Sequence, residues 1–144
     1  NGFINYLGTT SDVLPIIREA DCMVLPSYRE GISRVLMEAA SMEKPIIATN
    51  VTGCREVIND GETGFLCKVK SPVDLAHKMA KIINMTEKEK VVMGQKGRVK
   101  VIEEMDLEKI IDVYDYKIAA VLGEEEGITV DLQELISIRK TKKI

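Results

Sequence analysis

The sequence contains few of the residue types on which metal centres and nucleophilic catalysis usually depend. It has one histidine, His77, three cysteines and no tryptophan in 144 residues. The cysteines, at positions 22, 54 and 67, include no Cys-x-x-Cys pair, which argues against a zinc site. We expect three reduced thiols in a cytoplasmic protein. Without a second histidine, Ser-His and Cys-His catalysis have little support, and His77 is expected at an ordinary helix position.

The sequence also lacks an excess of basic residues and a long apolar run. Its net charge is −3 and its isoelectric point is about 5.3, which argues against nucleic acid as the main partner. No apolar run approaches the ~18 residues of a membrane span. Residues 1–6 do not resemble a signal peptide. The first residue is not methionine, so we expect coding sequence upstream of Asn1.

Buried strands alternate with helices along the first half of the chain. The apolar runs at 22–25 and 45–48 are typical of strands covered on both faces of a parallel sheet. The helix expected between them, from about Ser33 to Met42, completes a βαβ unit. The pattern therefore predicts an α/β fold with a Rossmann-like parallel sheet and flanking helices. Further elements are expected as a strand at 3–7, a helix capped by Ser11, helical turns at 53–58 and a strand at 65–67.

The second half of the chain reads as helices followed by a tail. Ser71 and Pro72 are expected to start the first helix, as its cap and first residue. A second is expected at 87–104, where Gly94 and Gly97 could allow a bend, and a third at 107–122. We expect a partial domain at 1–123 and a linker with a helical or flexible basic tail at 124–144. The tail is either a solvated end or a contact with an anionic membrane surface.

Residues 26–38 place Glu30 and Glu38 eight positions apart around a turn from strand to helix. In a parallel α/β sheet, ligands bind at the carboxyl ends of the strands. The free N–H groups of residues 31–34 and the helix dipole would favour an anion such as a diphosphate there. Glu38 would lie roughly 7–8 Å further along the helix axis, where a ribose would sit. Glu30, just before the helix, would then lie on the other side of the diphosphate, where the sugar of a sugar nucleotide would be. The plainer alternative is a strand-loop-helix with solvated glutamates.

A longer succession of motifs resembles a known family. It consists of 26–31 leading to Glu38-Ala39, then Lys44-Pro45-Ile46-Ile47-Ala48-Thr49, then Gly53-Cys54-Arg55-Glu56-Val57, then 60–66. In this order it resembles the C-terminal, donor-binding half of a group 1 (family 4) retaining glycosyltransferase of GT-B fold. The resemblance covers about residues 3–122. Ser33-Arg34 and residues 53–56 are similar to members that build bacterial capsule, lipopolysaccharide O-antigen or related lipid-linked glycans.

The resemblance implies a role for each site residue. Glu30 would contact the transferred sugar near the reaction centre, and Glu38 would bind the ribose. The amides of about Ile32–Val35 would contact the sugar and the diphosphate. No metal or other cofactor is implied, and the donor substrate is a nucleoside-diphosphate sugar. The expected substrate-binding residues are thus Gly31, Ile32, Ser33, Arg34, Val35 and Glu38, with Glu30 as the catalytic residue.

The same resemblance implies a function for the complete protein. A sugar would pass to a glycan or lipid-linked acceptor with retention of configuration, in the cytoplasm or at the inner face of the membrane. The family's N-terminal acceptor domain, a Gly-rich turn and a basic residue that neutralises the diphosphate are missing here, so this chain alone is expected to be inactive. A non-catalytic remnant or interaction module of the same fold, and a sugar-nucleotide epimerase, are the alternatives. Glu43 stands where the family usually has glycine, and a turn with positive φ would be strained there.

Overall fold

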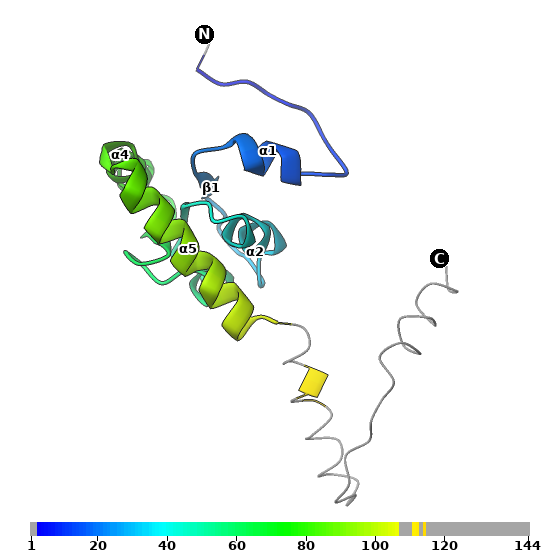
Figure 1. Cartoon of the computed structure of the whole chain (residues 1–144). Coiled ribbons are helices and arrows are strands. Elements are labelled where there is room, and N and C mark those ends of the chain that lie inside the picture. Colours follow the sequence, from blue (N-terminus) through cyan, green and yellow to red (C-terminus); the bar gives the residue numbers. More distant parts are fainter. Residues whose placement is uncertain (1–2, 107–110, 113, 115–144) are drawn as a thin grey trace, which may run out of the picture. The chain divides into compact units, whose positions relative to one another are not determined.

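The structure is a computed structural model that describes residues 3–106, 111, 112 and 114. Residues up to Glu104 form one compact unit (Figure 1). Of the helix expected at 107–122, only three residues are described, and all three are helical. The expected boundary at residue 123 and the tail at 124–144 lie outside the described residues.

Short helices and strands alternate through the compact unit. In chain order they are α1 (Leu14–Glu19), β1 (Met23–Leu25), α2 (Arg34–Ser41), β2 (Ile46–Thr49), α3 (Thr52–Val57), β3 (Gly64–Cys67), α4 (Pro72–Asn84) and α5 (Glu87–Glu104). The sequence predicted the βαβ unit, both later helices and the cap of α4. In that cap, Oγ of Ser71 accepts a hydrogen bond from the N–H of Asp74.

The three strands form one parallel sheet in the order β1-β2-β3. Met23 lies opposite Ile46 in the first pair, and Ile46 lies opposite Gly64 in the second. Every residue of β2 is buried, as expected for a central strand covered on both faces. The predicted α/β fold with a parallel sheet is confirmed.

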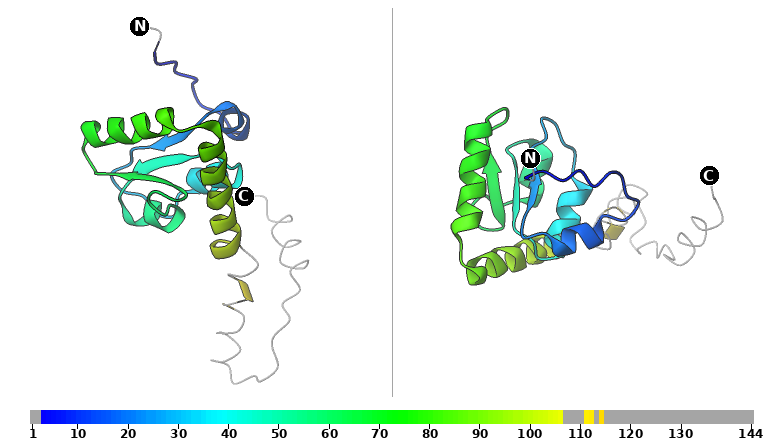
Figure 2. Two further views of the ribbon diagram at one scale, coloured as in Figure 1. Left: turned by 60° about the vertical axis from the view of Figure 1, so that its left-hand side comes forward. Right: turned by 90° about the horizontal axis from the view of Figure 1, so that it is seen from above.

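Helices cover both faces of this sheet (Figure 2). On one face, Ile47 of β2 packs in a core cluster with Ile82 of α4 and Met93 of α5. On the other face lies α2, where Leu36, Ala39 and Ala40 are buried. The small side chains of Ala39 and Ala40 let α2 pack closely.

Helix α5 crosses the amino ends of the strands. A β-carbon on Gly94 would overlap the backbone carbonyl of Glu43, just before β2, and one on Gly97 would lie 3.6 Å from the carbonyl oxygen of Thr63, just before β3. The two glycines therefore serve close packing within α5, which continues through both positions. Because α5 occupies the amino ends, the carboxyl ends of the strands stay free of it.

The turn between α2 and β2 contains the expected strain. Glu43 has φ of 58°, in the left-handed region that glycine adopts most easily. Its carboxylate lies 3.8 Å from Nε of Arg98 on α5, and Arg98 also donates a hydrogen bond to the carbonyl of Ser41. These contacts stabilise the turn against a backbone cost of about 1–2 kcal/mol.

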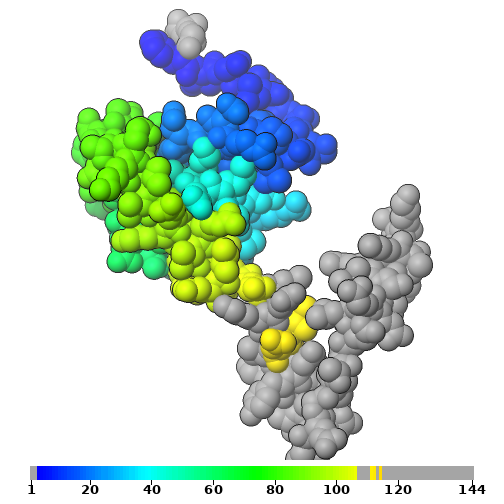
Figure 3. Space-filling model, in the orientation of Figure 1, coloured from blue at the N-terminus to red at the C-terminus, as the bar shows by residue number. Residues whose placement is uncertain are grey.

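Two local predictions were wrong. Residues 3–7 form no strand, and Phe3 and Tyr6 are 99% and 85% exposed; in Figure 3 this dark blue stretch projects from the body. A strand needs a neighbour to pair with its N–H and C=O groups, and no described residue pairs with this one. Ser11 does not cap α1; instead Oδ1 of Asp12 accepts a hydrogen bond from the N–H of Leu14 at 3.1 Å.

No helix among the described residues is both long and apolar enough to span a lipid bilayer.

Candidate functional site

The turn from β1 to α2 brings free backbone N–H groups to the carboxyl edge of the sheet. Ser33 precedes α2, and its carbonyl accepts hydrogen bonds from the N–H groups of Leu36 and Met37. Its own hydroxyl is buried and has no partner among the described residues. The N–H groups of Arg34 and Val35 likewise have no acceptor within the described chain, as is normal in a first helical turn. These donors and the helix dipole make the start of α2 suited to an anion.

Two residues outside the predicted site hold this turn in place. Gly53 of α3 packs against it so closely that a β-carbon there would overlap the carbonyl of Gly31 and lie 2.7 Å from that of Glu30. Thr49, at the end of β2, donates a hydrogen bond from Oγ1 to the carbonyl of Ser27. Sequence reasoning missed both roles. The available signal was a glycine near the start of a helix, where glycine is a poor helix former and so indicates a close approach.

Glu30 lies half-buried where the turn meets α3. Burial raises the pKa of the neighbouring Cys54 thiol; the negative charge of Glu30 raises it further, and a hydrogen bond with Thr49 partly opposes both. The Glu30 carboxylate is therefore close enough to Cys54 to affect its ionisation. The raised pKa keeps this thiol protonated at neutral pH.

Glu38 lies in the second turn of α2, on the side that faces α1. Its Oε1 accepts a hydrogen bond of 2.8 Å from Nε of Arg34, one turn earlier. Both residues line a pocket of about 410 Å³ with Leu14 and Arg18 of α1. The Arg34 side chain is 88% exposed, and an exposed pair of this kind contributes only ~0–1 kcal/mol. A ligand hydroxyl could therefore replace Arg34 as the partner of Glu38 at little cost.

The structure thus assembles the predicted residues around the first turns of α2. Gly31, Ile32 and Arg34 are exposed, Val35 and the two glutamates are half-buried, and Ser33 is buried. Glu30 precedes the free N–H groups of Arg34 and Val35 in the chain, and Glu38 follows them on α2. Within the described part of the chain, no group of three or more His, Cys, Asp or Glu side chains could hold a metal ion.

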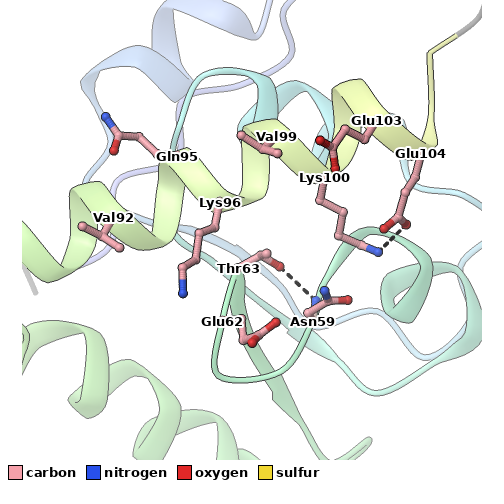
Figure 4. A pocket seen from close by; sticks show the side chains of 10 residues that line it. All are labelled: Asn59, Glu62, Thr63, Val92, Gln95, Lys96, Val99, Lys100, Glu103 and Glu104. Carbon is pink, nitrogen blue, oxygen red and sulfur yellow. Dashed lines mark hydrogen bonds and ion pairs between the residues drawn. The ribbon is translucent and has the colours of Figure 1, made fainter.

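A second pocket, of about 420 Å³, lies at the opposite end of the sheet (Figure 4). It is formed by α5 and the turn before β3, where the N–H of Asn59 donates to Oγ1 of Thr63 at 2.9 Å. Lys96 and Lys100 of α5 line this pocket together with Glu62 of the turn and with Glu103 and Glu104 at the end of α5, and Lys100 pairs with Glu104. Opposite charges are thus mixed along its lining, and it is remote from the predicted site.

Comparison with known proteins assigns the chain to a family. Residues 2–100 match the family model described as Glycosyl transferases group 1. The chain belongs to this family. A curated relative from Campylobacter jejuni is named N,N'-diacetylbacillosaminyl-diphospho-undecaprenol alpha-1,3-N-acetylgalactosaminyltransferase. It is 34% identical over 83 residues, which are 58% of this chain and 22% of that relative.

Two solved structures locate the chain within the GT-B fold. The C-terminal domain of the group 1 glycosyl transferase LpcC from Francisella tularensis is 26% identical with a TM-score of 0.62, and the match covers 72% of this chain and 53% of that one. Anabaena HepE, solved in complex with UDP, has a TM-score of 0.69 at 24% identity, covering 81% and 31%. The resemblance to the C-terminal domain of a GT-B glycosyltransferase is confirmed, and the chain spans only part of these relatives.

Proposed function

We propose that this chain is the donor-binding part of a retaining group 1 glycosyltransferase. The complete enzyme would transfer a sugar from a nucleoside-diphosphate sugar to a glycan or lipid-linked acceptor, as a hexosyltransferase does. The observation that carries the proposal is the first turn of α2, where free N–H groups lie between Glu30 and Glu38. The UDP complex of the structurally similar HepE supports a nucleotide donor.

Each site residue has a distinct part in this proposal. The N–H groups of Arg34 and Val35 hold the diphosphate oxygens, with the amides of residues 31–33 reaching the sugar side. Glu38 exchanges its bond with Arg34 for hydrogen bonds from the ribose hydroxyls, which a carboxylate accepts well. Glu30 lies beside the transferred sugar, where its negative charge stabilises the positive charge that develops at the anomeric carbon.

The acceptor and the setting of the reaction complete the proposal. The relative from Campylobacter jejuni has diphospho-undecaprenol in its name, which supports a lipid-linked acceptor for this chain as well. A domain outside this chain would supply the main binding site for that acceptor. We place the reaction in the cytoplasm or at the inner face of the membrane, with residues 1–123 as the donor-binding portion and 124–144 as a linker and basic tail.

Titration of the 144-residue chain with UDP, ADP and GDP, followed by backbone amide NMR, tests donor binding. The amides of Gly31–Val35 should shift with at least one nucleotide. Glu38→Gln should weaken that binding about tenfold, because a charge-assisted hydrogen bond contributes ~1.5–3 kcal/mol. Glu62→Gln, at the opposite end of the sheet, is the matched control and should bind as the unchanged chain does. Equal affinity for both variants would remove Glu38 from the ribose site.

Kinetics of the complete transferase test the role of Glu30. Glu30→Ala should lower kcat by at least about 100-fold, the range of a lost electrostatic contact to the transition state, while donor affinity changes little. Equal losses of kcat and donor affinity would make Glu30 a binding residue only.

A non-catalytic interaction module of the same fold is the second candidate. The pairing of Glu38 with Arg34 favours it, since the carboxylate expected at the ribose already has a partner. If no nucleoside diphosphate shifts the amides of Gly31–Val35 in the titration above, this second candidate replaces the first.

A further inference from the structure

A pocket distinct from the start of α2 lies along the carboxyl edge of the sheet. Its volume is about 400 Å³, and all three strand ends contribute to it: Pro26 follows β1, Thr49 ends β2 and Cys67 ends β3. The loop from β3 to α4 closes its other side with Lys68 and Lys70. Pockets in this position of a parallel α/β sheet are the usual place for ligands.

The charged groups that line this pocket are both positive. Lys68 and Lys70 are exposed, the lining includes no carboxylate, and neither lysine forms an ion pair with any residue that the structure describes. The nearby Asp74 lies outside the lining, where its Oδ2 accepts a hydrogen bond of 2.7 Å from the backbone N–H of Lys68. That bond orders the loop and leaves both ammonium groups available to an anion.

Tyr28 and Lys70 connect the two loops that border the pocket. The ammonium of Lys70 lies 5.6 Å from the centre of the Tyr28 ring, within the range of a cation–π contact. Lys70 adopts φ of 58°, a left-handed conformation that costs a residue with a side chain about 1–2 kcal/mol. Such strained positions are concentrated where a side chain must be aimed at a ligand. The Tyr28 side chain is largely exposed, so a ligand can reach its ring.

This pocket also lies beside the residue expected at the reaction centre. Tyr28 precedes Glu30 by two residues. Thr49 lines the pocket and donates a hydrogen bond from Oγ1 to the carbonyl of Ser27, in the turn that carries Glu30. A group bound here would therefore be next to the transferred sugar, while the donor diphosphate occupies the start of α2.

We propose that this pocket, which we call the Tyr28–Lys70 pocket, binds the phosphorylated saccharide end of the acceptor. The inference rests on the function proposed above, because only that function places the transferred sugar at Glu30. The apolar faces of Tyr28, Pro72 and Leu75 suit the carbon face of a sugar ring. The two lysines suit a phosphate, to which lysine binds as a point charge.

NMR titration of the 144-residue chain with glucose 1-phosphate tests the pocket directly. The amides of residues 68–71 and the ring signals of Tyr28 should shift. Neutral methyl glucoside and inorganic phosphate each supply half of the ligand and should bind at least about tenfold more weakly. Shifts confined to Gly31–Val35 would place the sugar phosphate at the start of α2 and overturn the proposal. So would an equal affinity for inorganic phosphate.

Substitution of Lys70 sharpens the test. Lys70→Asn removes the charge, and asparagine tolerates the left-handed backbone, so the fold is retained. It should weaken glucose 1-phosphate binding about tenfold and leave the nucleotide-induced shifts at Gly31–Val35 unchanged. Lys96→Asn, in the remote pocket of Figure 4, is the matched control and should change neither. Equal effects of the two substitutions would contradict the proposal.

In the complete transferase, Lys70→Asn should raise the KM for a phosphorylated acceptor about tenfold and keep the KM for the donor within about twofold. An equal rise in both values, or a rise in neither, would overturn the acceptor assignment. The proposed donor site is tested by a different measurement, the nucleotide-induced shifts at Gly31–Val35. The donor proposal and the acceptor proposal can therefore fail independently.

Discussion

The carbonyl oxygen of Gly31 occupies the space that a β-carbon on Gly53 would need. This contact brings the start of α3 against the turn that carries Glu30, and it is possible only because Gly53 has no side chain. The position of Glu30 in the site therefore depends on Gly53, a residue without a side chain that could contact a ligand.

Gly53→Ala should destabilise the chain by about 3 kcal/mol, at the upper end of the cost of overpacking, because the overlapping atoms are backbone. Urea unfolding provides the measurement. Gly31→Ala is the matched control on the other side of the contact. A β-carbon on Gly31 would have no atom within 4 Å, so its free energy of unfolding should stay within about 0.5 kcal/mol of the unchanged chain. Similar losses in both variants would contradict the described packing.

Gly94→Ala and Gly97→Ala should have opposite effects, although both glycines lie in α5. Each substitution gains up to about 1 kcal/mol of helix propensity. At Gly94 this gain is outweighed, because the new β-carbon would overlap the carbonyl of Glu43, and we expect a net loss of about 2 kcal/mol. At Gly97 the nearest atom is 3.6 Å away, an ordinary contact. Thermal unfolding should therefore rank Gly97→Ala at or above the unchanged chain, and the reverse order would refute this account.

Glu43→Gly should give a more stable chain than Glu43→Ala by about 1 kcal/mol. Both substitutions remove the ion pair with Arg98, so the comparison isolates the backbone. Glycine adopts the φ of 58° without the steric cost that alanine retains. Chemical denaturation of the two variants measures the difference, and equal stability would show that the turn relaxes to accept a side chain.

The thiols should react slowly while the chain is folded. Burial raises the pKa of Cys22 to about 11, and burial also raises the pKa of Cys54 and of Cys67, the latter with a further contribution from the charge of Asp74. Only thiolates react with iodoacetamide, so at pH 8 alkylation of all three should be at least about tenfold slower than in urea. Mass spectrometry of timed samples reports each cysteine separately.

The same shifts imply a pH dependence of stability. A thiol whose pKa is higher in the folded than in the unfolded chain favours folding below the unfolded pKa, near 8.5, and that contribution is lost as the pH rises towards the folded pKa. The free energy of unfolding should therefore fall between about pH 8.5 and 11. A Cys22→Ala variant should show a shallower fall, and an equal slope would indicate that Cys22 is not the group responsible.

Local patterns were enough to predict most elements of the compact unit. The apolar runs around Val24 and Ile47 became the first two strands, and Ser71 caps α4 as its hydroxyl and the following proline suggested. These signals involve residues only a few positions apart, whose side chains and backbone groups interact within one element. Residues 3–7 carry the same kind of apolar signal and form no strand, since a strand also requires a partner.

The sequence by itself thus determined the alternation of strands and helices, the turn that bears Glu30 and Glu38, and the strain expected at Glu43. Only the tertiary structure decided that Gly53 and Thr49 hold this turn, that Arg34 pairs with Glu38, and that Lys70 reaches the ring of Tyr28. The physical reason is how far apart in the sequence the interacting groups lie. Periodicity and capping act within one element, whereas contacts between loops depend on how the sheet brings distant strand ends together.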